Sequence, residues 1–257
     1  MQTGAITPYI DVAQLVLYAF WIFFAALIWY LIKENKREGY PLVTNRPGER
    51  PSGLVPVPAP KTFLLPNGKT KSVPWNEPLE VLNARQSAPW EGAPIIPLGN
   101  PMQDGLGPAA YTQRDDEPEK MPEGEDRIVP IRVAHGYSVA SEDPDPRGAP
   151  VITLDGKTAG TVIDLWVDLA DQQLVWYEAD AATTPTRRVM FPATLVCVQG
   201  SGSAIKVKVA SVTAQQFAEA PSLAEPDRIT PREEDRLMAY FASGHLYATP
   251  QRSEPYL

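Results

Sequence analysis

The feature that most constrains this chain is an apolar run from Val12 to Ile32, in which Gln14 is the only side chain that is neither apolar nor aromatic. A helix rises about 1.5 Å per residue, so this run would be about 31 Å long, which matches the hydrocarbon thickness of a bilayer. A charged segment that begins at Lys33 ends the run. The sequence therefore predicts one transmembrane helix over residues 12–35.

The charges that flank the span predict its orientation. Residues 1–11 contain no lysine or arginine, whereas Lys33, Lys36 and Arg37 follow the span directly. The positive-inside rule then places residues 1–11 in the periplasm and the large C-terminal part in the cytoplasm. A cleaved signal peptide is the alternative, but it would have a basic n-region and a shorter apolar core.

Cysteine, histidine and charge content exclude several classes of protein. The single cysteine, Cys197, cannot form an internal disulfide, and the two histidines, His135 and His245, are far apart in the sequence. Because neither CxxC nor HExxH occurs, a metal site made by this chain alone is not expected. The net charge of −8 opposes binding of nucleic acid or anionic lipid by the bulk of the soluble part, so a protein partner is expected.

Sequence motifs of enzyme active sites are also missing. No GxGxxG, P-loop or GxSxG pattern occurs, and the glycine-rich segment 200–203 is interpreted as a loop between two strands. The acidic run 115–119 is interpreted as a solvated loop. The sequence therefore predicts a chain that is not an enzyme, has no catalytic residue and binds no cofactor or metal of its own.

Proline is concentrated in one segment after the span. The chain has 28 prolines, and 14 of them lie within residues 41–110. Proline lacks an amide donor and fixes φ, so this segment cannot be mainly helix or central strand. It nevertheless contains many apolar side chains, which disordered segments usually lack, among them Val55, Phe63, Leu64, Trp75, Leu79, Trp90, Ile95 and Leu98. We expect residues 36–110 to form an extended strap that lies on another surface, partly on partner subunits.

Residues after about Arg127 show the alternation that is typical of β-strands. Val207 and Val209 alternate with lysines, which indicates a strand with one buried face, and residues 163–168 alternate in the same way. Asp155-Gly156 marks a turn. Further strands are expected at 151–154, 174–179, 188–191 and 195–199. Short strands at this spacing predict a small antiparallel barrel or sandwich within residues 111–257.

One helix is signalled near the C-terminus. Thr230 can cap it, Pro231 suits its first position, and Glu233 completes a capping box. Gly244 is a typical stop signal. We therefore expect a helix over residues 231–242, which follows the mainly-β part of the domain.

Seven blocks, in order along the chain, resemble one known family. They are REGYPL (37–42), PKTFLLP (60–66), GNPM (99–102), DGLGPA (104–109), DLWVD (164–168), REED (232–235) and LYATP (246–250). Together they resemble the H subunit of the purple-bacterial photosynthetic reaction centre, which has a single span and a cytoplasmic PRC-barrel domain. The blocks extend over nearly the whole chain.

The resemblance implies a role without catalysis. An H subunit of this family covers the cytoplasmic faces of the L and M subunits in the bacterial inner (photosynthetic intracytoplasmic) membrane. Those partners hold the bacteriochlorophylls, bacteriopheophytins, quinones and non-haem iron. The resemblance leaves open contacts with light-harvesting antenna, with a bound cytochrome and with membrane lipids.

The resemblance also implies a proton route to the secondary quinone. In relatives a surface carboxylate just after the DLWVD block is associated with proton entry, and its position here is Asp171. Histidines associated with entry in relatives are replaced here by Glu123 and Glu125. Clustered, partly buried carboxylates can titrate near neutral pH. The proton-uptake candidates are Asp171, Glu123, Glu125, Glu234 and Arg127.

One pair among these candidates has a competing interpretation. Relatives often have an arginine four residues after the entry carboxylate, close to a glutamate of the REED block, but this chain has Val175 there. Glu234 would then depend on Arg127 alone. We expect a structural Glu234–Arg127 ion pair in preference to a proton relay.

A second class of function is a free-standing, membrane-anchored PRC-barrel adaptor that binds a cytosolic protein without photochemistry. The aromatic-rich span and the apolar strap argue against it, because alone they would expose large apolar surfaces. Near-infrared absorption of the purified native complex would separate the two.

Overall fold

The computed structural model describes residues 5–7, 10–40, 42, 53–66, 68–74, 81–90 and 92–253. The chain divides into two compact units, Met1–Val81 and Leu82–Leu257. The predicted strap therefore contributes to both units. Two of its apolar residues, Trp75 and Leu79, lie outside the described residues.

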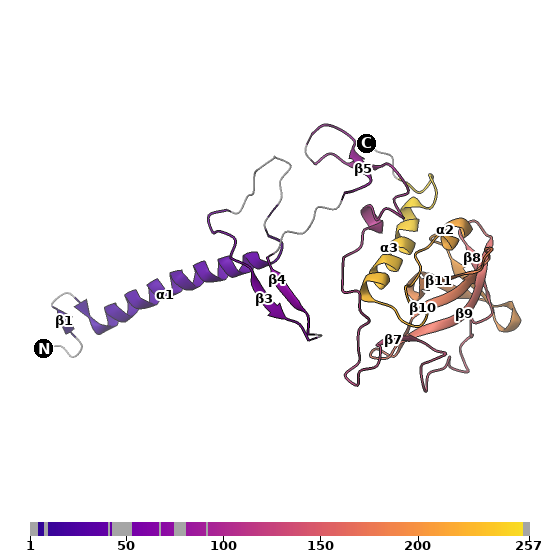
Figure 1. Ribbon diagram of the computed structural model, residues 1–257, viewed down its shortest axis with the longest axis horizontal. Coiled ribbons are helices and arrows are strands. Elements are labelled where there is room, and N and C mark those ends of the chain that lie inside the picture. Colours follow the sequence, from indigo (N-terminus) through magenta and orange to yellow (C-terminus); the bar gives the residue numbers. More distant parts are fainter. Residues whose placement is uncertain are drawn as a thin grey trace. The chain divides into compact units, whose positions relative to one another are not determined.

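The first unit is dominated by the apolar helix α1 (Val12–Glu34), which the 3₁₀ helix η1 (Asn35–Arg37) extends (Figure 1). Asp11 caps α1 by accepting a hydrogen bond from the backbone N–H of Gln14 at 2.7 Å. The helical stretch Val12–Arg37 is long and apolar enough to cross a membrane, and its most apolar window is not buried in the structure. The predicted span is confirmed as a single apolar helix.

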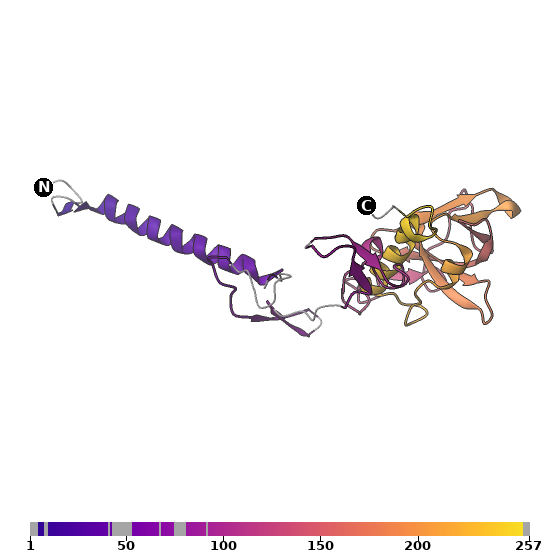
Figure 2. The ribbon, with the colours of Figure 1, turned by 90° about the horizontal axis from the view of Figure 1, so that it is seen from above.

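Two short hairpins flank α1 along the sequence. Strands β1 (Ala5–Thr7) and β2 (Ile10–Asp11) pair before the helix, and β3 (Lys61–Leu64) and β4 (Thr70–Val73) pair after it. Figures 1 and 2 both show β3 and β4 beside the end of α1. The proline-rich segment thus contains local hairpins as well as extended chain.

The second unit begins with a hairpin of β5 (Ala84–Gln86) and β6 (Ile95–Pro97), followed by the 3₁₀ helix η2 (Gly107–Ala109). Its main sheet has seven strands in the order β11-β10-β9-β8-β13-β12, with β7 pairing with β9. The strands are β7 (Ile128–Pro130), β8 (Pro150–Thr153), β9 (Thr158–Asp168), β10 (Gln173–Ala181), β11 (Arg187–Pro192), β12 (Val196–Gln199) and β13 (Lys206–Val209).

The pairing of this sheet is antiparallel except where β13 runs parallel to β8. The predicted small barrel of short strands is confirmed, with this one parallel pair as a difference. The alternation at β13 holds, because Val207 and Val209 are buried while Lys206 and Lys208 are exposed.

Strand β9 differs from the prediction of one buried face. Leu165 and Val167 are buried, but so are Asp164, Trp166 and Asp168 on the opposite face. Polar residues on a strand can be buried when they have charged partners, and both aspartates pair with arginines. Alternation in sequence therefore does not distinguish a solvated face from a buried ionic one.

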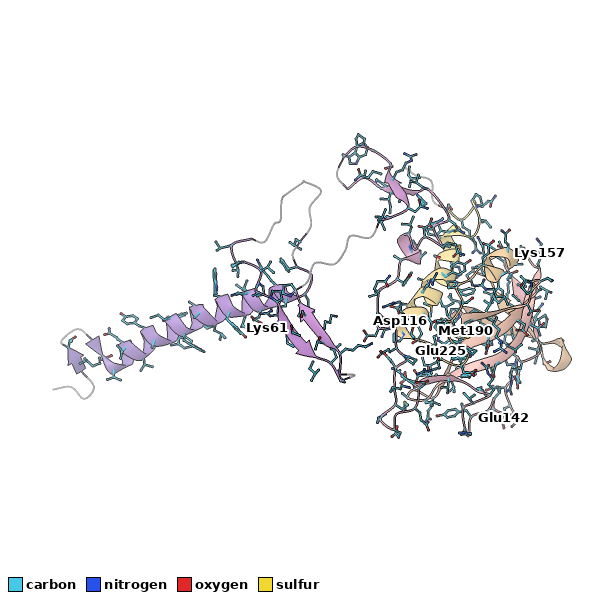
Figure 3. The ribbon with its side chains drawn as sticks, viewed as in Figure 1. Lys61, Asp116, Glu142, Lys157, Met190 and Glu225 are labelled. Atoms are coloured by element: carbon cyan, nitrogen blue, oxygen red, sulfur yellow. The ribbon has the colours of Figure 1, made fainter. Side chains whose placement is uncertain are left out.

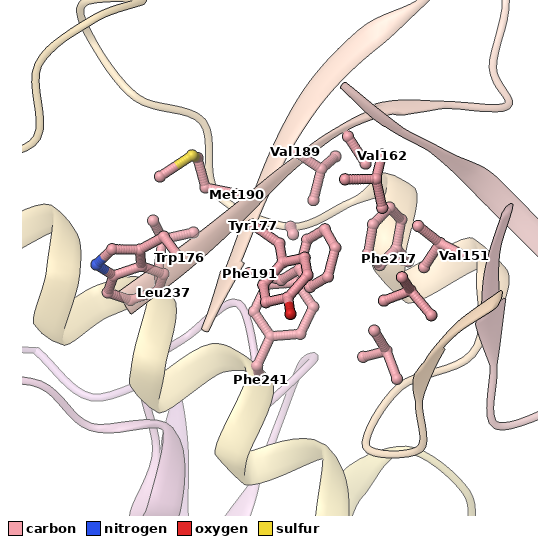
Figure 4. Close-up of a cluster of buried hydrophobic side chains, with 14 of the residues drawn as sticks. Val151, Val162, Trp176, Tyr177, Val189, Met190, Phe191, Phe217, Leu237 and Phe241 are labelled. Atoms are coloured by element: carbon pink, nitrogen blue, oxygen red, sulfur yellow. The ribbon is translucent and has the colours of Figure 1, made fainter. Parts of the chain in front are cut away.

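Two helices cover the sheet. Helix α2 (Ala214–Ala218) is short, and α3 (Pro231–Tyr247) begins with the predicted capping box of Thr230 and Glu233. The aromatic rings of Phe191, Phe217 and Phe241 meet between sheet and helices at centroid distances of 5.3–6.3 Å (Figure 4). These rings form the centre of the hydrophobic core.

Helix α3 does not end at Ala242 as expected but continues through Gly244 to Tyr247. The stop prediction was wrong because Gly244 serves packing and not termination. A Cβ atom at Gly244 would lie 2.4 Å from the backbone oxygen of Ser211 and 2.8 Å from a methyl group of Val212. Only glycine lets the helix approach that segment so closely.

Candidate functional site

Arg127 contacts three carboxylates, of which Asp171 is one of the predicted proton-uptake residues. It immediately precedes β7, and the pairing of Ile128 with Asp168 brings its side chain to the end of β9. The guanidinium binds both carboxylate oxygens of Asp168 through Nε, at 3.1 and 3.0 Å. It also binds Asp171 through Nη2 and Glu119 through Nη1, each at 3.0 Å.

Asp168 anchors this arrangement. Its Oδ1 accepts hydrogen bonds from the backbone N–H groups of Ala170, at 2.9 Å, and Asp171, at 3.2 Å. Burial alone would raise the pKa of Asp168, but Arg127 and the two N–H groups outweigh burial and lower it. The pKa of Arg127 is raised, above all by Asp168. Both groups are therefore charged at neutral pH.

Asp171 lies on the turn that follows β9 and is the exposed member of the group. Its side chain is 62% exposed, compared with 5% for Asp168. The same arginine thus joins a buried carboxylate to one that meets bulk water. The structure places Asp171 at the surface, as the sequence predicts.

Glu234 lies in the first turn of α3 and is partly buried. Burial raises the pKa of Glu234, and the charge of Glu119 raises it further. Trp176 Nε1 donates a hydrogen bond to its carboxylate at 3.4 Å, and this bond and the charges of Arg114 and Arg127 oppose the rise without cancelling it. On balance the pKa of Glu234 is therefore raised above the ordinary value for a glutamate.

The expected Glu234–Arg127 ion pair is wrong. Arg127 pairs with Asp168, Asp171 and Glu119, and within the described part of the chain no ion pair joins it to Glu234. The physical reason is register, because β7 pairing directs the guanidinium to the end of β9 and not to α3. The charge of Arg127 still acts on Glu234 and opposes the rise in its pKa.

Glu119 and Arg114 belong to this site and were missed in the sequence. Arg114 lies 3.4 Å from Glu119 and 3.4 Å from Asp235, next to Glu234. The chain between Glu119 and Arg127 folds back on itself, since the N–H of Arg127 donates to the backbone oxygen of Glu119 at 2.8 Å. Glu119 is in the acidic run 115–119, for which the sequence predicts a solvated loop. The sequence offers one signal for this contact: Gly124 lies between Glu119 and Arg127 and permits a turn that brings the two together.

Glu123 and Glu125 lie at the tip of that same turn and are exposed. Gly124 between them has a φ of +96°, which favours glycine at this position. Across the residues that the structure describes, neither glutamate takes part in an ion pair; the pair beneath them joins Lys120 to Asp126. The structure brings Asp171 and Arg127 into contact, but it leaves Glu123 and Glu125 at the surface.

A second ionic cluster lies in the barrel and was not predicted. Arg132 Nη1 lies 2.9 Å from Asp164 and also contacts Glu178, while Arg132 Nη2 binds Asp227 at 2.6 Å. The Glu178 side chain is only 2% exposed and accepts a hydrogen bond from Trp166 Nε1 at 3.1 Å. Arg132 thereby connects the sheet to the loop before α3, a structural function.

The arrangement of histidine, cysteine and acidic side chains also bears on metal binding. Among the residues that the structure describes, no group of three or more histidine, cysteine or acidic side chains is arranged to hold a metal ion. Cys197 is exposed on β12.

Comparison with protein families agrees with this architecture. The family model of the photosynthetic reaction centre H-chain N-terminal region matches residues 4–133, and the PRC-barrel domain model matches residues 139–212. The first match includes the span, both hairpins of the proline-rich segment and the turn that carries Arg127. The second match includes β8 to β13, six of the seven strands of the main sheet. The first match alone extends over more than half of the sequence, so the chain belongs to the photosynthetic reaction centre H-chain family.

Proposed function

We propose that this chain caps the L and M subunits on the cytoplasmic side, stabilises the quinone sites and supplies protons to the secondary quinone. Membership of the H-chain family makes it a structural subunit of a reaction centre that assembles with L and M subunits and does not itself bind cofactors. The cap and the proton route are the further steps that we propose.

Proton supply requires carriers that can both take up and release a proton near neutral pH. The observation that carries this proposal is the raised pKa of Glu234, together with Glu119, whose charge acts on Glu234 and whose carboxylate binds the same arginine as the exposed Asp171. Asp171 is exposed to bulk water and binds Arg127, which also binds Glu119. The charge of Glu119 in turn acts on Glu234. The order of the route is Asp171, then the Glu119 region, then Glu234.

Asp168 has a different function in this proposal. Its pKa is lowered, so it stays ionised and holds Arg127 in place without carrying protons. Conduction therefore depends on the carboxylates around Arg127 and not on the one that it binds most closely.

The cap proposal is supported by exposed apolar side chains in the proline-rich segment. Leu54 is 92% exposed, Trp90 63% and Leu98 61%. Large apolar side chains that stay exposed are frequent in surfaces that bind other proteins. Partner subunits would cover them, and the basic residues after the span support a cytoplasmic location for this part of the chain.

The test is the second, proton-coupled electron transfer to the secondary quinone, measured by flash spectroscopy on the isolated complex. Replacing Asp171 by Asn together with Glu123 and Glu125 by Gln should slow this step, by about tenfold or more if the three provide the entry. Glu234→Gln alone should slow it as well, because its relay proton is lost. The first electron transfer, which needs no proton, should keep its rate in every variant.

Glu142→Gln is the matched control, since Glu142 is an exposed carboxylate of the same domain (Figure 3). It should leave both rates unchanged. An unchanged second transfer in the triple variant between about pH 6 and pH 9 would show that protons enter elsewhere. Absence of this chain from the isolated pigment complex would contradict the cap.

A further inference from the structure

The charge of this chain is distributed unevenly along its length. Residues 33–81 contain eight basic and five acidic residues, a net charge of +3, whereas residues 82–257 contain 15 basic and 25 acidic residues, a net charge of −10. Repulsion from anionic lipid therefore applies to the second part of the chain and not to the segment that directly follows the span.

Hairpin β3–β4 concentrates this positive charge on one face. Side chains alternate between the faces of a strand, and directly paired residues share a face. The register pairs Lys61 with Val73 and Phe63 with Lys71, so two lysines and a phenylalanine lie on one side. Phe63 is 47% exposed, and both lysines are exposed. Lys69, also exposed, immediately precedes β4.

The hairpin is fixed to the end of the span. Lys61 Nζ lies 3.0 Å from Glu34, the last residue of α1, near the helix end in Figure 3. Arg37 Nη1 donates to the backbone oxygens of Ala59, at 2.8 Å, and Val73, at 3.2 Å. These bonds hold both ends of the hairpin at the point where the chain leaves the hydrocarbon.

We propose that the Lys61–Phe63–Lys71 face, with Lys69, binds the anionic headgroups of phospholipids at the membrane surface. A phenylalanine between lysines suits the boundary between acyl chains and headgroups, because the ring enters the apolar side while the ammonium groups meet phosphate. Charges act over about 8 Å at physiological salt, so basic groups contribute only when they are held near the surface, and the bonds to Glu34 and Arg37 fix this hairpin beside the end of the span. The hairpin is a surface anchor beside the transmembrane anchor.

This inference depends on the span and on the hairpin geometry, and not on the proton route. Loss of lipid binding would leave the electron-transfer test of the proposed function intact, and a failed proton test would leave this one intact. The competing occupant of the same face is a partner subunit, which would protect the lysines equally in neutral and in anionic lipid.

The experiment places the whole complex in nanodiscs of phosphatidylcholine alone, or of phosphatidylcholine with about one-third phosphatidylglycerol, and follows amine labelling by mass spectrometry. Lys69 and Lys71 should react about fivefold more slowly in the anionic discs, the effect expected for one ammonium group near a charged surface. Lys206 and Lys208, an exposed pair on β13, should change by less than about twofold. Salt at about 1 M should remove the difference.

A matched variant pair keeps the proposal open to refutation. Lys69→Gln with Lys71→Gln should reduce the phosphatidylglycerol that copurifies with the complex, whereas Lys206→Gln with Lys208→Gln should not. Equal labelling of Lys69 and Lys71 in both kinds of disc overturns the proposal. Strong protection that is the same in both lipids also overturns it, because a partner protein would then cover the face.

Discussion

At the scale of single residues, the candidate site depends on how one guanidinium is shared. Arg127 contacts a buried carboxylate and an exposed one at similar distances, yet the two ion pairs contribute differently to stability. Water screens the pair with Asp171, whereas Asp168 has exchanged its hydration for Arg127 and two backbone N–H groups. Removal of the two carboxylates should therefore have unequal effects on stability.

We expect Asp168→Asn to lower the free energy of unfolding of the domain by about 2–4 kcal/mol at neutral pH, because a largely buried arginine contact loses its charged partner. The folded-state pKa of Asp168 is lowered, so its contribution is present above the unfolded pKa of about 3.9 and lost as pH falls below it. The deficit of the variant should thus shrink below about pH 4. Urea unfolding of the full chain in detergent measures it.

Asp171→Asn, the same change on the same arginine, is the control and should cost less than about 1 kcal/mol. Equal losses in the two variants would show that burial does not distinguish the two ion pairs.

At the scale of elements, α3 illustrates how packing overrides a local signal. Its start follows the capping box in the sequence, since Thr230 and Glu233 act within four residues of each other. Gly244 does not end the helix, because this glycine instead lets the backbone of Ser211, more than 30 residues away in the sequence, approach α3. Helix propensity and packing therefore make opposite predictions for one substitution.

Gly244→Ala should destabilise the domain by about 1–3 kcal/mol, although alanine is the better helix former by about 1 kcal/mol. The added methyl group would meet a backbone oxygen that cannot move without shifting the chain. Thermal unfolding followed by circular dichroism is the measurement.

His245→Ala, at the exposed neighbouring position, tests propensity without the clash and should change stability by no more than about 0.5 kcal/mol. A Gly244→Ala protein as stable as the wild type would mean that Ser211 and α3 are not in close contact.

At the scale of the whole molecule, charge and hydropathy divide the chain into an apolar span, a basic segment and an acidic domain. The basic residues favour retention of the following segment on the cytoplasmic side. The acidic domain has its own hydrophobic core, formed by residues between Met102 and Phe241. The membrane topology of the chain can therefore be tested separately from the folding of its domain.

Trypsin added to sealed, right-side-out cells should leave residues 82–257 intact, whereas inverted membrane vesicles should expose them. Lys157, on the turn between β8 and β9, has a side chain that is 75% exposed and offers a cleavage site. Digestion at Lys157 in intact cells would contradict the cytoplasmic location and with it the proposed cap. A cytoplasmic marker enzyme that stays uncut in the same cells is the control for sealing.

Local patterns in the sequence were sufficient for the span, the barrel strands and the start of α3. An apolar run of bilayer length, a period of two and a capping box each act over a few neighbouring residues, so they can be read without the fold. The absence of cofactor-binding motifs can also be seen in the sequence alone, and it predicts a chain that binds no cofactor of its own. The resemblance to the H-chain family was also a property of the sequence, and the family match confirms it.

Contacts between distant segments were decided only by the tertiary structure. The pairing of Arg127 with Asp168, the place of Glu119 in the same cluster and the burial of Asp164 and Glu178 around Arg132 join residues eight to 46 positions apart. Strand register selects these partners, and the balance between burial and hydrogen-bonding or charged partners then sets whether the pKa of a carboxylate is lowered, as at Asp168, or raised, as at Glu234. Neither quantity has a local signature, because both depend on which other segments exclude water from the side chain.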